Sequence, residues 1–455
     1  MSPRLRPHHP QNHPRQAMLV TMNGCRATSK RRAGPISRGG TTERMQQTPV
    51  ITRHPLNTGV LELRTIAAPT DGELFRIAER INPKRSFLFV STVLGRHIPV
   101  RPRDHFDAVN GIVDQIPDAL LGGPLLVMGY AETAVGIGAA AARRIRERRP
   151  EADLLYLSTT RHPVAGREWV SFSEGHSHAT AHHVMAPTSS ELLSGSARTL
   201  VLVDDETTTG NTFAALFKAV RDGGVDVKRV LLLTLTDWSN GRAAQAIAEL
   251  CPGIPVNAFS LVRGEWRWEQ DAKATLPAVP IWAGEATLPA WVPNPNPVPN
   301  PLFQAPRLGL QMELIVEPTV ESTVESTIEL MTPLIPTALP TVAAGDSVLV
   351  IGTGEHVWGP MLLAERLEQE GADVTFVATT RSPILNGEVI RHKVVFPDHY
   401  RVGVPMYLHN VPERPCARVI IMTETGDDGI CPTLRAYLGR GHIINGAGQV
   451  TEFKT

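Results

Sequence analysis

The sequence predicts an α/β protein whose parallel sheet is covered by helices on both faces. Short apolar runs, which are typical of buried strands, alternate along the chain with segments whose apolar residues recur at helical spacing. Strands and helices in alternation form βαβ crossovers, and these crossovers produce parallel strands. The length of 455 residues suits two or three domains of ordinary size. The chain is therefore expected to hold more than one such unit.

The first unit is predicted to contain four buried strands and two helices. Buried strands are predicted at 125–128, 154–157, 201–205 and 230–234, because each of these segments is a short apolar run. Helices are predicted at 136–149, which ends in a basic turn, and at 213–220.

Changes in composition divide the chain into four parts. Residues 1–45 are rich in Arg, Pro, His and Ser and nearly lack acids. We expect a disordered basic extension there; a start codon assigned too early or a nucleic-acid-binding arm would also explain this composition. Residues 57–290 form the first predicted domain. A Pro-rich and low-complexity stretch, 291–341, is expected to be a linker, and 342–455 a second α/β domain.

The overall composition favours a soluble cytoplasmic protein. Lys plus Arg and Asp plus Glu number 45 each, so no global field attracts nucleic acid. No apolar run approaches the ~18 residues of a membrane helix. The four cysteines are scattered without a CxxC pair, which suits a reducing compartment and no disulfide framework. Neither a nucleic-acid nor a membrane partner is expected, while a homodimer is compatible with the sequence.

The most informative segment is 201–212, Val-Leu-Val-Asp-Asp-Glu-Thr-Thr-Thr-Gly-Asn-Thr. A predicted strand ends in Asp204 and Asp205, and a Thr/Gly turn then leads into a helix. Such a turn presents backbone N–H groups and the positive end of the helix dipole to an anion. Ligands of open α/β sheets bind at the carboxyl ends of the strands. Paired carboxylates beside a phosphate cradle suit a phosphorylated sugar, because its vicinal hydroxyls need acceptors.

Two neighbouring strands end in further candidate loops. The turn 129–134, Gly-Tyr-Ala-Glu-Thr-Ala, has small residues that let backbone approach a phosphate, although packing alone would also explain them. Arg161 follows the next strand, and an arginine suits bidentate phosphate binding. The segment 172–179 places Glu174, His176 and His178 at alternate positions. A zinc site, a solvated polar loop and a mobile loop over the ligand are the three interpretations of that segment.

The segment 201–212 resembles the signature of type I phosphoribosyltransferases that binds 5-phosphoribosyl 1-pyrophosphate (PRPP), except that Thr207 replaces an apolar residue. Together with 129–134, Thr-Thr-Arg-His at 159–162 and Thr-Arg-Ser-Pro at 380–383, it resembles a bacterial family in which a phosphoribosyltransferase-like domain precedes a TRSP domain. That family is associated with tellurite-resistance and stress gene clusters and with a nucleoside-like metabolite. The resemblance implies a type I phosphoribosyltransferase fold, a parallel sheet with a hood, followed by a second Rossmann-like domain.

The resemblance also implies site residues. PRPP is expected to bind Asp204, Asp205, Thr207, Thr208, Thr209, Gly210, Asn211 and Thr212. Pyrophosphate is expected at Tyr130, Ala131, Glu132, Thr133 and Arg161. Since type I enzymes carry a mobile loop between these strands, we favour that interpretation of the 172–179 segment. The catalytic residues are then expected to be Glu174, His176 and Asp205. A hood over the acceptor would use Lys84, Arg85, Arg96 and His97, unless these are only surface charges.

The implied reaction displaces pyrophosphate from C1 of PRPP by a nitrogenous, base-like acceptor. Mg²⁺ is the expected cofactor, with no protein ligand of the metal assigned. Glu174 and His176 would handle the acceptor proton, because histidine titrates near neutrality. Two alternatives stay open: a PRPP-sensing regulator without catalysis, and phosphorolysis, the reverse reaction at the same site.

A comparison of the chain with itself predicts a degenerate second copy of the first domain. The segments around Gly129, 157–163 and 200–206 have echoes, in the same order, around Gly352, 377–383 and 419–426. This alignment places Met422 and Thr423 at the positions of the acid pair, so no PRPP binding is expected there. Gly352, Gly354, Glu355 and Arg381 would cradle a phosphorylated ligand or merely form internal salt bridges. Two unrelated α/β domains are the alternative.

Overall fold

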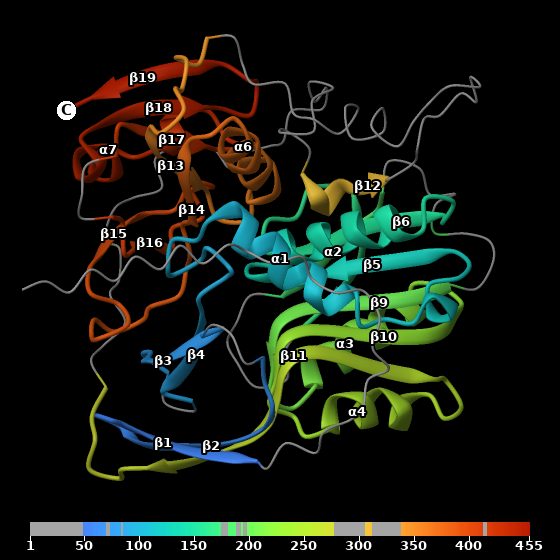
Figure 1. Ribbon diagram of the computed structural model, residues 1–455. Helices are drawn as coiled ribbons and strands as arrows, with labels where there is room; N and C mark the ends of the chain where they lie inside the picture. Colours follow the sequence, from blue (N-terminus) through green and yellow to red (C-terminus); the bar gives the residue numbers. More distant parts are fainter. Residues whose placement is uncertain are drawn as a thin grey trace, which may run out of the picture. The chain divides into compact units, whose positions relative to one another are not determined.

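Five parallel strands form the centre of the first sheet in the computed structural model (Figure 1). The structure describes residues 49–69, 73–82, 85–173, 181–187, 193, 198–276, 305–311, 338–412 and 416–455. We call 49–276 the first half and 338–455 the second half. The central strands are β5 (Leu125–Gly129), β6 (Leu154–Thr160), β9 (Arg198–Thr207), β10 (Val227–Asp237) and β11 (Val256–Gln270), in the spatial order β11-β10-β9-β5-β6.

Helices cover this sheet, which explains why its strands are nearly continuous apolar runs. Helix α1 packs beside α2, and α3 packs beside α4 (Figure 1). Their bounds are α1 (Pro102–Val113), α2 (Ala134–Arg148), α3 (Asn211–Asp222) and α4 (Arg242–Leu250); a short 3-10 turn, η1 (Asp118–Leu120), follows α1. All the strands and helices predicted for this half are present, so the predicted α/β class is confirmed.

Hairpins extend the first half at both sides. Strands β1 (Val50–Leu56) and β2 (Gly59–Ala67) join the sheet through β11, while β7 (Glu168–Phe172) and β8 (His182–Met185) join through β6. Strands β3 (Phe75–Glu79) and β4 (Phe87–Ser91) form a separate hairpin. The ring of Phe89 stacks on that of Trp238 with centroids 4.9 Å apart, which anchors this hairpin over β10.

The second half builds a smaller sheet in the order β14-β13-β17-β18-β19. Strands β13 (Ser347–Gly352), β14 (Asp373–Ala378), β17 (Arg418–Met422) and β18 (Arg440–Ile444) are parallel, and β19 (Val450–Lys454) is antiparallel. Its other elements are α6 (Trp358–Gln369), the hairpin β15 (Lys393–Pro397) and β16 (Pro405–His409), η5 (Asp427–Gly429) and α7 (Pro432–Leu438). None of the described helices is long and apolar enough to cross a membrane.

The two halves share one strand order. In the first sheet four neighbouring strands are arranged β6-β5-β9-β10, and in the second sheet four are arranged β14-β13-β17-β18. In both sheets the first of these strands in the chain lies between the second and the third, and all four are parallel. Gly129 lies opposite Ser158 and Val203, and Gly352 lies opposite Ala378 and Met422. The two sheets therefore have the same topology, as a second copy of the fold requires.

This register corrects one detail of the sequence alignment. Because Met422 occupies the position of Val203, the residues at the positions of Asp204 and Asp205 are Thr423 and Glu424. The sequence alignment was shifted by one residue at this strand, so it did not identify Glu424 as the acid at the position of Asp205.

A further chain segment covers the outer edge of each sheet. Val100 pairs antiparallel with Phe376 of β14, with N···O distances of 2.9 and 2.7 Å. Leu310, in the two-residue strand β12 (Leu310–Gln311), pairs antiparallel with Tyr156 of β6. Tyr156 and Phe376 are equivalent positions, so both exposed edges are covered in the same way. Residues 305–311, which include η4 (Pro306–Leu308), fall within the predicted linker but belong to the folded structure.

Candidate functional site

Two carboxylates lie at the carboxyl end of β9. Asp204 is opposite Thr234 of β10, and its Oδ1 accepts a hydrogen bond from the Asp205 amide at 3.0 Å. The Thr133 hydroxyl donates to Asp205 Oδ1 at 2.9 Å. This bond joins the acid pair to the turn that follows β5, so the structure brings the two predicted loops together at one sheet edge.

The acid pair is partly buried without a counterion in the described part of the chain. Burial raises the pKa of Asp204 well above its usual range, and the neighbouring Asp205 raises it further. Burial also raises the pKa of Glu206, although the Arg85 guanidinium, 2.8 Å away, opposes that shift. Among the described residues, no ion pair forms to Asp204 or Asp205. The pair therefore favours a ligand that brings positive charge.

The turn after β9 requires glycine. Gly210 has φ 82°, and a Cβ there would come 2.3 Å from the Cα of Ala243. Helix α3 starts at the next residue, so the turn 208–210 aims the helix N-terminus at the sheet edge. The predicted phosphate contacts Thr208 to Thr212 lie on this turn and the first turn of the helix. Thr207 is buried, and its carbonyl accepts from the Trp238 amide at 2.8 Å.

The turn after β5 offers fewer amides to an anion than the sequence suggests. The Tyr130 amide donates to Val203 O at 3.4 Å, and the Ala131 amide donates to the Thr159 hydroxyl at 2.8 Å. Within the described part of the chain, no group accepts from the amides of Glu132 and Thr133. Of the four turn residues predicted to bind pyrophosphate, Glu132 and Thr133 are thus the two whose amides have no acceptor among the described residues.

Arg161 lies where predicted, at the end of β6. Its amide donates to Glu355 Oε1 at 2.6 Å, and the preceding Thr160 hydroxyl donates to Glu355 Oε2 at 2.5 Å. A glutamate from the second half therefore holds the backbone of this strand end.

The predicted acceptor contacts are largely engaged elsewhere. Arg96 is 2% exposed, and its guanidinium donates to the carbonyls of Gly354 and Thr379 at 2.7 Å each and to that of Glu132. His97 is buried, and its ring packs edge-on against His409. Both residues lie at the junction of the halves, so the expectation that they contact an acceptor is wrong.

The other two predicted acceptor residues differ from each other. Arg85 pairs with Glu206 and lies over the Phe87 ring at 4.7 Å, whereas Lys84 lies outside the described residues. A cavity of about 1040 Å³ lies beside the hairpins instead, lined by residues 52–57, 73–79 and Val262 of the first half and 385–390 of the second.

The predicted loop catalysts Glu174 and His176, and the zinc candidate His178, also lie outside the described residues. Among the described residues, no cluster of three or more His, Cys, Asp or Glu is suited to hold a metal.

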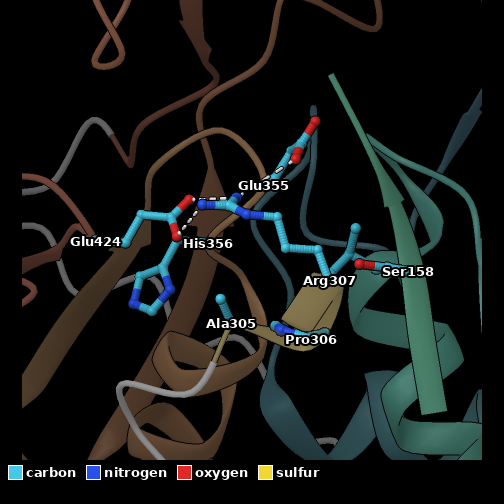
Figure 2. Close-up of a pocket in the computed structure, with 8 residues that line it drawn as sticks. Ser158, Ala305, Pro306, Arg307, Glu355, His356 and Glu424 are labelled. Carbon is cyan, nitrogen blue, oxygen red and sulfur yellow. Dashed lines mark hydrogen bonds and ion pairs between the residues drawn. The ribbon is translucent and has the colours of Figure 1, made fainter. Parts of the chain in front are cut away.

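The equivalent site of the second half is filled by a side chain. Figure 2 shows the Arg307 guanidinium between Glu424 and Glu355. Its two amino groups donate to both oxygens of Glu424 at 2.8 and 2.7 Å, and it lies 3.7 Å from Glu355. The space left beside it is about 10 Å³. Of the two predictions for Gly352, Gly354, Glu355 and Arg381, the internal salt bridge is the one observed for Glu355.

Arg381 joins the same network. Its guanidinium donates to His162 Nε2 at 3.0 Å, and the His162 ring stacks on Tyr400 with centroids 3.7 Å apart. Burial, followed by the nearby Arg381 and Arg307, lowers the pKa of His162 to about 3, so the ring is neutral and accepts. The Tyr400 hydroxyl donates to Glu424 at 2.6 Å. Sequence reasoning missed Arg307, Glu424, His162 and Tyr400; only Glu424 had a sequence signal, the acid after an apolar strand.

A parallel sheet with an acid pair and a glycine-containing strand-to-helix turn at its carboxyl edge is the arrangement found in α/β domains whose ligands bind beyond the carboxyl ends of the strands. Family comparison agrees. Residues 74–265 match the family model described as phosphoribosyl transferase, and residues 316–430 match the model described as the TRSP domain C-terminal to it. The chain therefore contains a phosphoribosyltransferase domain followed by a TRSP domain. No curated protein matches the sequence.

Several solved structures are similar to part of the chain. Adenine phosphoribosyltransferase from Trypanosoma brucei, in complex with AMP, pyrophosphate and ribose-5-phosphate, is 11% identical with a TM-score of 0.31, over 43% of this chain and 82% of that one. The Giardia lamblia enzyme, complexed with 9-deazaadenine, is 15% identical with a TM-score of 0.29, over 42% and 93%. Orotate phosphoribosyltransferase from Aeropyrum pernix is 18% identical with a TM-score of 0.27, over 41% and 86%.

Proposed function

We propose that the protein is a Mg²⁺-dependent pentosyltransferase that transfers ribose 5-phosphate from PRPP to a nitrogenous, base-like acceptor and releases pyrophosphate. The observation that carries this proposal is the hydrogen bond between Thr133 and Asp205. It holds an acid pair for ribose hydroxyls next to a turn for pyrophosphate, at the edge from which the 208–212 turn faces the 5-phosphate. One PRPP molecule needs these three contacts at once.

The acid pair suits the charge that develops during transfer. Departure of pyrophosphate leaves positive charge on the sugar, and Asp204 and Asp205 supply negative charge beside it. The Glu132 and Thr133 amides, with Arg161, receive the leaving group. In the proposed assignment Asp205 orients the sugar, while Glu174 and His176 handle the acceptor proton.

Mg²⁺ fits the donor set as a metal shared between protein and substrate. It is commonly held by one or two carboxylates plus substrate phosphates, and Asp204 and Asp205 are the carboxylates available at this edge. Bound there, the ion would neutralise pyrophosphate oxygens as they depart. This arrangement needs no cluster of three protein ligands.

The acceptor is proposed to enter the cavity beside the hairpins. That cavity borders Val262 of β11, and Val262 is in register with Thr236 of β10, which is in register with Glu206 beside the acid pair. We place the reaction in the synthesis of a nucleoside-like metabolite connected with a stress or tellurite response, as the family resemblance implies.

The test is pyrophosphate release from PRPP by the full-length protein with Mg²⁺ and one base at a time. We expect release that depends on Mg²⁺ and on a particular base, and that the double variant Asp204→Asn, Asp205→Asn abolishes. PRPP binding without turnover on any base or in a cell extract would favour a PRPP-sensing regulator. Absence of PRPP binding would refute both functions.

A further inference from the structure

The second half holds the side chain of Glu132, which lies on the proposed pyrophosphate turn. Glu132 Oε2 accepts a hydrogen bond from the Thr380 hydroxyl at 2.7 Å and one from the Arg381 amide at 3.2 Å. Thr380 is 1% exposed and lies just beyond the end of β14. The acceptor and its two donors therefore come from different halves of the chain.

The same contact is made in the reverse direction. Glu355 on the equivalent turn of the second half accepts from the Thr160 hydroxyl at 2.5 Å and the Arg161 amide at 2.6 Å. Each glutamate thus reaches across to the strand end of the other half. Two copies of one surface that exchange identical contacts form an isologous interface, as in a two-fold dimer. Here both copies belong to a single chain.

Both exchanged contacts converge on the proposed pyrophosphate site. One orients Glu132 and the other fixes the Arg161 backbone. A carboxylate on a turn that receives pyrophosphate would repel the anion unless it were directed away from it and hydrogen-bonded. The Arg96 guanidinium also holds the Glu132 carbonyl and two carbonyls of the second half. These bonds fix both ends of Glu132, while its amide and that of Thr133 have no acceptor within the described ranges.

We propose that Thr380 and the Arg381 amide position Glu132 so that the 130–133 turn can bind pyrophosphate. The second half is then part of the pyrophosphate site, although it binds no PRPP itself. Thr380 acts as a positioning residue, since it touches the turn and not the substrate. This inference rests on the proposed phosphoribosyl transfer.

The test compares two ligands on the full-length protein by calorimetry: magnesium pyrophosphate and ribose 5-phosphate. Thr380→Val removes the hydroxyl with little change of shape, and Thr380→Ser retains it. We expect Thr380→Val to weaken pyrophosphate binding about tenfold and to change ribose 5-phosphate binding less than twofold. Thr380→Ser should bind both ligands like the unaltered protein. Thr380→Ala replaces Thr380→Val if the valine variant does not fold.

A matched control lies elsewhere in the same interface. Glu365 of α6 forms a bidentate ion pair with Arg143 of α2, at 2.7 and 2.9 Å, well along the helix from the turn. Glu365→Gln should leave both affinities unchanged. Unchanged pyrophosphate binding in Thr380→Val, equal loss of both ligands, or an equal loss in Glu365→Gln would each overturn the inference. If the unaltered protein binds neither ligand, the proposed function itself fails.

Discussion

The ends of β9 and β17 are equivalent positions of two sheets, but among the described residues an arginine side chain pairs only with the acid at the second. Asp205 and Glu424 are equivalent, but of the two only Glu424 forms an ion pair within the described ranges. Although burial opposes ionisation of Glu424, the Arg307 guanidinium lowers its pKa, helped by His356 and the Tyr400 hydroxyl. At Asp204 no such partner exists among the described residues, and burial raises the pKa. The two acids therefore differ in their pKa shifts because Arg307 pairs with Glu424.

The turns that follow β9 and β17 also differ, in their side chains and in the helix that comes next. After β9, the turn 208–210 leads into the 12-residue helix α3. After β17, the corresponding positions are Asp427 and Asp428 in η5, and the next helix, α7, has 7 residues. Carboxylates at the place of the threonines would repel a phosphate. The second half therefore keeps the strand order but has an arginine paired with its acid and two carboxylates where the first half has threonines.

Removal of Arg307 should be the most damaging change to the second half. Arg307→Met leaves Glu424 and Glu355 buried without their cation, and we expect it to lower the free energy of unfolding by about 3–5 kcal/mol. Ribose 5-phosphate affinity should stay within twofold in the folded protein. Urea unfolding and calorimetry measure the two quantities.

A double-variant cycle sharpens this comparison. Arg307→Met combined with Glu424→Gln should cost clearly less than the sum of the single changes, because the two groups compensate one another. Additive losses would mean that Arg307 does not occupy the site as a counterion.

Buried neutral histidines should make the second half sensitive to acid. His399 is fully buried, its Nε2 lies 3.0 Å from the Thr379 hydroxyl, and burial lowers its pKa to about 4. The unfolded chain, with a histidine pKa of about 6.5, binds the proton more readily. The contribution of the neutral, buried His399 ring to the free energy of unfolding is therefore fully present above about pH 6.5, and it is lost as the pH falls toward 4.

The corresponding measurement is the unfolding free energy at pH 7.5, 6 and 5. His399→Gln should reduce the loss on acidification by about 1–3 kcal/mol. An identical pH dependence in the variant would show that the ring is protonated in the folded state or exposed to solvent.

Local patterns predicted most of the fold and the acid pair. The strand runs, the Thr-Gly turn and the order of the two copies are all encoded by neighbouring residues. Arg307 could not be found this way, because its role depends on a Pro-flanked segment returning to the junction. Arg96 was misassigned for a similar reason: an arginine before the sheet looks exposed until the second half covers it. Glu424 was missed because a one-residue slip in a strand alignment leaves the apolar pattern unchanged.

The number of PRPP molecules bound per chain tests the central claim most directly. Calorimetric titration of the full-length protein with PRPP and Mg²⁺ should give one site per chain. The double variant Asp204→Asn, Asp205→Asn should weaken that site at least 100-fold, since two charged hydrogen-bonding groups are lost. Glu424→Gln should leave it unchanged. Two sites per chain, or loss of binding in Glu424→Gln with retention in the double variant, would contradict the account.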